Sequence, residues 1–144
     1  MKHRVIIIDG MGGGIGVQLI GRLKELNDPE LDIIALGTNA VATERMMKAG
    51  AHRGATGENA IRISTVQGDF IMGPIGIVIS NSMMGEITPG MAEAILKARG
   101  ERILLPLQQD HFYLAGLEQL PLAKMTDKAV EIFKERLRFS NQAG

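Results

Sequence analysis

Cysteine and tryptophan are absent from this sequence, and aromatic residues make up only 3% of it. The lack of cysteine excludes disulfides, thiolate nucleophiles, iron–sulfur clusters and Cys-ligated zinc, and it fits the reducing cytoplasm. Neither sign of charge prevails, because 16 basic residues balance 16 acidic ones. A domain that binds duplex nucleic acid is expected to be basic, and one that binds single strands needs aromatic side chains for stacking. The composition therefore predicts no nucleic-acid partner.

Long hydrophobic runs are missing as well. The basic start is followed by a short apolar run, residues 5–8, which cannot make a signal peptide. The longest weakly polar stretch, residues 70–84, is shorter than the roughly 18 to 20 residues that a membrane helix needs. We therefore expect a cytoplasmic protein without a membrane partner. A length of 144 residues, 45% of them hydrophobic, predicts one domain covering residues 1–144.

Glycine is abundant, with 18 of the 144 residues, against a usual share of about 7%. Between the glycines, apolar runs of strand length alternate with segments whose apolar residues recur at helical spacing. We expect strands at residues 4–8, 33–36, 51–55, 70–79 and 103–107, an edge strand at 112–115, and helices at 15–26, 40–48, 89–99 and 122–137. Residues 57–66 are ambiguous, and we favour a helix there. The alternation predicts an α/β, Rossmann-like three-layer sandwich with a mostly parallel sheet of five or six strands in the order 3-2-1-4-5.

The sharpest motif lies between the first strand and the first helix. It reads Asp9-Gly10-Met11-Gly12-Gly13-Gly14-Ile15-Gly16. Glycines permit positive φ and let a ligand approach the backbone, and the following helix begins with unpaired N–H groups and a partial positive charge. The motif therefore predicts a site for the phosphate of a nucleotide or dinucleotide. The alternative is a tight turn that only brings the helix close to the sheet.

The spacing of Gly10, Gly14 and Gly16 resembles the cofactor loop of short-chain dehydrogenases, which makes NAD(P) or another nucleotide the cofactor class to consider. Dinucleotide sites usually have an acid at the end of the second strand, where this chain has Gly37-Thr38-Asn39. Arg45 lies deep in the next helix and offers no obvious clamp for a 2′-phosphate. The Tyr and Lys pair of those dehydrogenases is missing too, since Leu117 stands four positions after Tyr113. The sequence leaves open whether any reaction is catalysed.

Other catalytic patterns are absent. Gly16 is followed by Val17-Gln18 rather than the Lys and Ser or Thr of a Walker loop, and no serine lies in a G-x-S-x-G turn. The three histidines, His3, His52 and His111, are far apart in sequence. We therefore expect no metal site.

Ligands of parallel α/β sheets bind at the carboxyl ends of the strands, and the polar and glycine residues there are the candidates for ligand binding. These are Asp9, Gly10, Gly12, Gly13, Gly14, Ile15, Gly16, Thr38, Asn39, Thr56, Glu58, Asn59 and Glu86. Each acid also has a structural explanation. Asp9 can accept from its own loop amides, Glu58 and its neighbours can cap a helix, and Glu86 can complement the positive end of the helix that begins at Thr88-Pro89.

The sequence as a whole resembles the short bacterial proteins of domain-of-unknown-function family 3842. The resemblance is carried by Asp9-Gly10-x-Gly12-Gly13-Gly14-Ile15-Gly16, Gly37-Thr38-Asn39, Gly54-Ala55-Thr56-Gly57-Glu58-Asn59-Ala60, Gly73-Pro74-Ile75-Gly76-Ile77-Val78 and Gly85-Glu86-Ile87-Thr88-Pro89. Met11 stands where that loop has Gln. The resemblance implies the fold and carries no activity.

Three functional hypotheses follow. The first is a protein that binds a phosphate-bearing small molecule at the Gly10 to Gly16 loop. The second is a non-catalytic homo-oligomer or interaction protein, whose apolar surface is residues 70–92 with Met83, Met84 and Met91. The third is an enzyme that uses Asp9, Glu58 or Glu86 on a phosphorylated metabolite.

Overall fold

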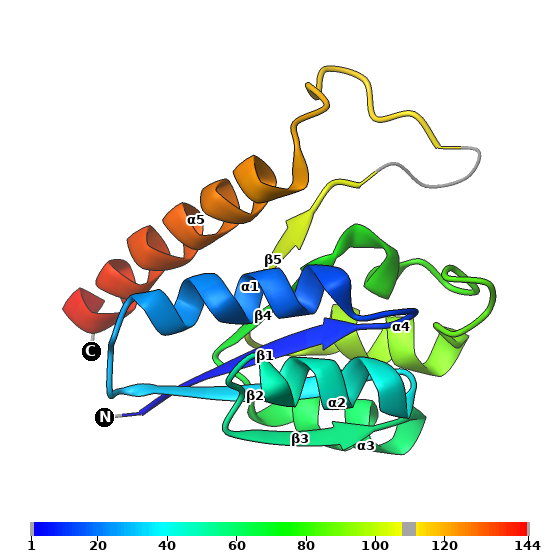
Figure 1. The fold of residues 1–144 in the computed structure, drawn as a ribbon, viewed down its shortest axis with the longest axis horizontal. Helices are drawn as coiled ribbons and strands as arrows, with labels where there is room; N and C mark the ends of the chain where they lie inside the picture. The colour runs from blue at the N-terminus through cyan, green and yellow to red at the C-terminus, as the bar shows by residue number, and fades with distance from the viewer. Residues whose placement is uncertain (1, 108–111, 144) are drawn as a thin grey trace.

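The computed structural model describes residues 2–107 and 112–143, along which strands and helices alternate (Figure 1). The strands are β1 (His3–Asp9), β2 (Leu31–Gly37), β3 (Arg53–Thr56), β4 (Phe70–Pro74) and β5 (Glu101–Leu105). The α-helices are α1 (Gly14–Glu25), α2 (Ala40–Lys48), α3 (Glu58–Ser64), α4 (Pro89–Lys97) and α5 (Leu122–Ala143).

The strands form one parallel sheet in the order β3-β2-β1-β4-β5. This confirms the Rossmann-like α/β fold and the strand order that the sequence predicts. The chain builds β1, β2 and β3 in one direction and then returns to place β4 on the other side of β1. The carboxyl ends of β1 and β4 therefore make the topological switch point, where ligands of such sheets bind.

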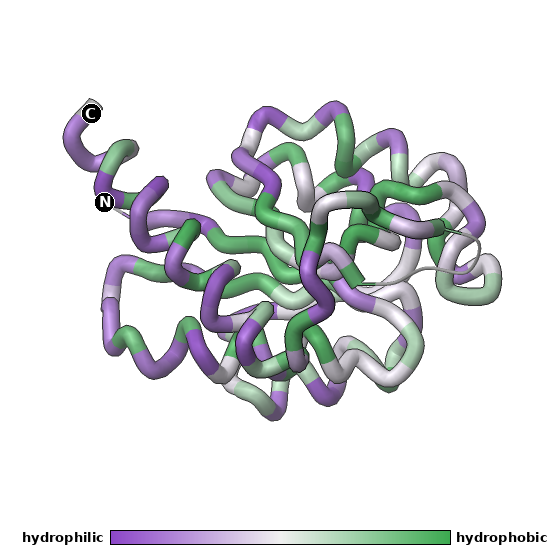
Figure 2. Tube along the Cα trace, turned by 90° about the horizontal axis from the view of Figure 1, so that it is seen from above, coloured by the Kyte–Doolittle hydropathy of each residue, from purple (hydrophilic) through white to green (hydrophobic). Residues whose placement is uncertain are grey.

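Helices cover both faces of the sheet, and residues 5–8 in the middle of its central strand β1 are all apolar. Val5 and Ile7 of β1 point to the face covered by α1, α2 and α5, whereas Ile6 and Ile8 point to the face covered by α3 and α4. All four side chains are fully buried. Figure 2 shows the hydrophobic strands in the interior and hydrophilic stretches of the helices toward the outside.

The terminal helix α5 packs on the sheet beside α1. Phe133 of α5 is fully buried and meets the ring of Phe70 in β4 edge-on, with the ring centroids 5.0 Å apart. Along the described residues, no helix is both long and apolar enough to cross a membrane.

Several expected boundaries were wrong. The expected strand at 70–79 ends at Pro74, where a 3₁₀ helix, Ile75–Val78, takes over. The third strand runs from Arg53 to Thr56 rather than over 51–55, and β5 ends at Leu105, just before Pro106. Proline explains two of these ends, since it cannot donate to a sheet.

The expected edge strand at 112–115 does not form. Residues 112–114 are exposed and belong to no strand. Gly116, with φ of 83°, lies in a turn closed by a bond from the Leu117 N–H to the Leu114 carbonyl. The described sheet thus has the smaller of the two expected strand numbers. The ambiguous segment 57–66 is helical, as favoured, and contains α3 followed by a short 3₁₀ helix.

Candidate functional site

The glycine loop leads from the end of β1 directly into α1. Gly13 adopts φ of 76°, and its N–H bonds the Gly10 carbonyl at 2.8 Å, which closes a tight turn. The helix begins at Gly14 without a side-chain cap from Gly13. The first turn of α1 therefore needs its acceptors from elsewhere in the chain.

The carboxylate of Asp9 supplies some of these acceptors. Its side chain is only 3% exposed, and its two oxygens accept from the N–H groups of Gly10 and Gly16, each at 2.8 Å. A carboxylate at this place also neutralises much of the positive end of the helix. The expected anion site is therefore smaller than the whole loop, because the chain itself occupies its inner amides.

Two outer amides are left. Among the described residues, the N–H groups of Gly12 and Gly14 donate no hydrogen bond. Both glycines are exposed. These two groups are the part of the loop that is open to an external anion.

The glycines of the loop differ in whether a side chain would fit at their position. A Cβ on Gly13 would lie 3.0 Å from the Cα of Ala42, and Gly13 has positive φ. A Cβ on Gly16 would collide with the Met46 side chain. A Cβ on Gly14 would meet nothing within 4 Å, and its φ is ordinary. Packing and backbone geometry thus explain glycine at 13 and 16, but not at 14.

Glu86 fastens the loop to the end of β2. Its Oε1 accepts from Thr38 Oγ1 at 2.5 Å, from the Met11 N–H at 2.8 Å and from Asn39 Nδ2 at 2.9 Å. A carboxylate therefore does reach the end of β2, where the sequence shows none, but it comes from a segment almost fifty residues later. The hydrogen bonds of Glu86 go to the loop and to the end of β2, and none of them goes to the first amides of α4, whose cap is Thr88.

Asn39 has two structural tasks. Its Oδ1 accepts from the N–H of Ala42, so it is the residue that caps α2. Its Nδ2 donates to Glu86 and to the Met11 carbonyl. Asp9, Thr38, Asn39 and Glu86 are thus brought together around the loop.

The candidates after β3 take part in other contacts. Thr56 bonds Thr43 of α2 at 2.7 Å, and Glu58 accepts from the hydroxyl of Thr88, which caps α4. No side chain caps α3, whose N-cap is Gly57. The capping explanation for Thr56, Glu58 and Asn59 at their own helix was therefore wrong, and none of the three bonds the glycine loop.

Arg45 lies at the glycine loop, although its place deep in the second helix of the sequence offered no obvious clamp for a phosphate. It projects from α2 so that its guanidinium donates to the Gly12 carbonyl. The described residues offer its other N–H groups no acceptor. The sequence shows only that Arg45 lies almost two helical turns after Asn39, the cap of α2. That position does not predict that α2 passes beside the glycine loop.

A cavity of about 390 Å³ lies beside the loop at the switch point between β1 and β4. We call it the switch-point cavity. It is lined by the loop itself and by residues such as Gln18, Pro74, Met83 and Leu122. Gly12 and Gly14, both exposed, are among the residues that line it.

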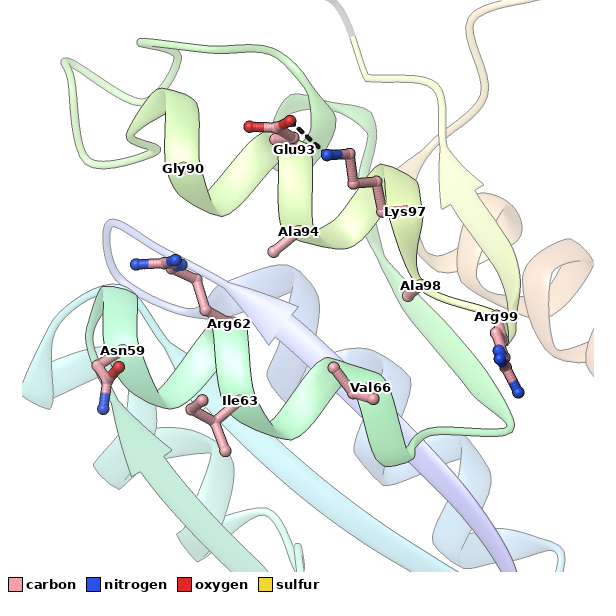
Figure 3. A pocket seen from close by; sticks show the side chains of 10 residues that line it. All are labelled: Asn59, Arg62, Ile63, Val66, Gly90, Glu93, Ala94, Lys97, Ala98 and Arg99. Carbon is pink, nitrogen blue, oxygen red and sulfur yellow. Dashed lines mark ion pairs between the residues drawn. The ribbon is translucent and has the colours of Figure 1, made fainter.

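A larger groove, of about 490 Å³, lies between α3 and α4 on the other side of the sheet (Figure 3). Asn59 lines it, together with the exposed side chains of Arg62 and Ile63. Glu93 and Lys97 on its far wall form an ion pair at 2.7 Å. Its walls are thus surface side chains of two short helices, and Asn59 is separated from the other candidates.

The two acids of the loop have pKa values shifted in opposite directions. Burial raises the pKa of Asp9 above its ordinary value, although the amides of Gly16, Gly10 and Ile15 oppose this, and the charge of Glu86 raises it further. Partial burial also raises the pKa of Glu86, but its bonds with Thr38, Met11 and Asn39 outweigh that effect and leave it lowered.

This difference predicts opposite pH dependences of stability. The raised pKa of Asp9 favours its protonated form on folding, so its contribution to stability should be lost as pH rises from about 4. The lowered pKa of Glu86 favours the ionised form, so its contribution should be lost as pH falls below about 4.5. Urea unfolding of wild type, Asp9→Asn and Glu86→Gln between pH 3.5 and 7 measures both. The stability advantage of wild type over Asp9→Asn should shrink with rising pH, and that over Glu86→Gln should grow; slopes of the same sign would contradict the assignment.

Among the described residues, no group of three or more His, Asp or Glu side chains could hold a metal ion. His3 bonds Asn141, and His52 accepts from the Ile33 N–H. His111 lies outside the described residues.

Fold and site together define a Rossmann-like α/β protein with a glycine loop at the start of its first helix. Residues 4–138 match the family described as a domain of unknown function, DUF3842, and the chain belongs to that family. This confirms the family resemblance seen in the sequence. No curated protein matches the chain significantly. Among solved structures, a dodecameric FMN-dependent Ubix-like decarboxylase from Escherichia coli O157:H7 is similar, with 17% sequence identity and a TM-score of 0.46. The match covers 91% of this chain and 75% of the decarboxylase chain.

Proposed function

We propose that the protein binds a phosphate-bearing small molecule, a nucleotide or dinucleotide, at the Gly10 to Gly16 loop. The proposal rests on the open backbone amides of Gly12 and Gly14. Their amides have no acceptor among the described residues, they are exposed, and glycine at 14 has no packing or backbone reason. A position kept free of a side chain beside open amides at a helix N-terminus is suited to the close approach of an anion.

Charge around the loop sets the strength of this site. The guanidinium of Arg45 lies against Gly12 and adds a positive group that a phosphate can pair with. Asp9 acts against binding, because its carboxylate already satisfies two amides of the loop. We therefore expect moderate affinity for one phosphate group, held by the outer amides and Arg45.

The geometry supports binding more than catalysis. The three acids that could serve acid–base chemistry, Asp9, Glu58 and Glu86, each accept hydrogen bonds from groups of the chain. A general acid or base must instead reach a proton of the substrate. An enzyme acting on a phosphorylated metabolite is accordingly the weakest of the three hypotheses.

Homo-oligomerisation is the second candidate, and exposed apolar side chains favour it. Met84 is 92% exposed and Tyr113 is 88% exposed, and Phe112 and Leu117 are exposed near Tyr113. Exposed large apolar side chains mark a protein interface where they gather into one patch. Met91, which the sequence placed on the same surface, is instead on the buried side of α4 and packs in the core.

A thermal-shift panel of NAD, NADP, FAD, AMP, ATP and sugar phosphates tests the proposal. A bound ligand at about 100 times its dissociation constant adds roughly 2.7 kcal/mol, which should raise Tm by about 5 to 10 °C for a domain of this size. Gly14→Val should abolish the shift while leaving the protein folded, because its side chain enters open space. Gly21→Val is the matched control, since Gly21 lies in the same helix and its Cβ also meets nothing within 4 Å.

The shift should persist in Gly21→Val. A shift that also persists in Gly14→Val would place the ligand elsewhere. If no compound raises Tm while light scattering shows a tight oligomer, the interaction hypothesis replaces this one.

A further inference from the structure

The switch-point cavity restricts what the ligand carries beside its phosphate. Its side-chain walls are mostly apolar and come from Met11, Ile15, Pro74, Met83, Leu107 and Leu122. These residues belong to the glycine loop, α1, the end of β4, the segment before α4, the segment after β5 and the start of α5. The fold gathers them at one edge of the sheet, next to the open amides of Gly12 and Gly14.

A ligand held at those amides can extend in two directions. Toward β2 it would meet Thr38 and Asn39, whose side chains already donate to Glu86. Extension there would have to break bonds of the chain, at the cost of leaving buried or half-buried polar groups unpaired. Toward β4 it enters the switch-point cavity of about 390 Å³, where contact with the apolar walls removes apolar surface from water and so favours binding.

We infer that the ligand is a phosphate monoester that carries a flat aromatic group, with the aromatic group lying against Met83 in the switch-point cavity rather than at the end of β2. The inference rests on the proposed phosphate site. A methionine thioether packs favourably on aromatic rings and adapts to their outline. A sugar phosphate, which has only hydroxyl groups to offer beyond its phosphate, would leave the apolar walls without a partner.

The comparison of AMP with ribose 5-phosphate tests this directly, because the two differ by the adenine base. Isothermal titration of the full chain with each compound measures both affinities. AMP should bind at least about tenfold more tightly, since the base buries apolar surface that the sugar phosphate cannot cover.

A pair of neighbouring variants locates the base. Met83 and Met84 have nearly the same positive φ, 56° and 57°, which asparagine tolerates well. Only Met83 lines the cavity, whereas Met84 is almost fully exposed. Met83→Asn should weaken AMP binding about fivefold and leave ribose 5-phosphate unchanged, because only the base loses a thioether contact. Met84→Asn should change neither.

The possible failures are distinguishable. If AMP and ribose 5-phosphate bind equally, or if Met83→Asn leaves the affinity for AMP intact, the inference is overturned while the phosphate site stands. If neither compound nor phenyl phosphate binds, the proposed function is lost together with the inference. Should Met83→Asn prove unstable in a thermal melt, the comparison of the two compounds on wild-type protein still decides.

Discussion

Replacing Phe133 with alanine is expected to lower the free energy of unfolding by about 3 to 5 kcal/mol, the usual cost of emptying a buried phenyl site. Phe133 is fully buried, and its ring packs edge-on against Phe70 of the sheet. The substitution would remove the largest side chain by which α5 is anchored to β4. Because domains of this size are stable by only about 5 to 15 kcal/mol, urea denaturation should show a much earlier transition.

Phe139→Ala is the control, with the same chemical change on the same helix. Phe139 is 62% exposed, and its ring contacts the Arg136 guanidinium at 5.0 Å. Loss of an exposed cation–π contact should cost only about 0.5 to 1 kcal/mol. Equal losses in the two variants would mean that α5 does not dock on the sheet through Phe133.

Gly13→Ala is expected to have the second-largest effect, a loss of about 2 to 4 kcal/mol. The left-handed conformation costs a residue with a Cβ about 1 to 2 kcal/mol, and crowding in a packed site adds a similar amount. At Gly13 both apply, because φ is 76° and the new Cβ would lie 3.0 Å from Ala42 of α2. Thermal and urea unfolding measure the loss.

Gly14→Ala, one position along, is the matched control. Its Cβ enters open space at the first position of α1, so stability should stay within about 0.5 kcal/mol of wild type or rise slightly. If both alanine variants were equally stable, the glycine loop would not have the backbone described for it. If both were equally damaged, glycine at 14 would have a structural purpose and the argument for an open anion site would fail.

The fold was predictable because its signals are local. Residues 5–8 are apolar without interruption, as a strand buried on both faces requires, and Thr88-Pro89 marks the start of α4 with a cap and a proline. Right-handed crossovers then leave few arrangements of alternating strands and helices. The errors fall where a local pattern cannot show whether a neighbouring strand exists, as at 112–115.

The site was predictable only in part. Asp9, the glycines, Thr38 and Asn39 follow from the rule that ligands bind where parallel strands end. The bonds between Glu86 and Thr38 and between Arg45 and Gly12 join residues 48 and 33 positions apart. No spacing in the sequence encodes such pairs, since they depend on where the segment before α4 and the side of α2 come to rest.

The sequence by itself determined the order of the elements, the parallel sheet and the position of a glycine loop before the first helix, because hydrophobic periodicity and turn chemistry act over a few residues. Only the tertiary structure decided which loop amides are open. Asp9 and Glu86 occupy the N–H groups of Gly10, Gly16 and Met11 and leave those of Gly12 and Gly14 to a ligand, and this depends on distances of about 3 Å between distant parts of the chain. The same packing brings apolar side chains from six segments together around one cavity beside Gly12 and Gly14.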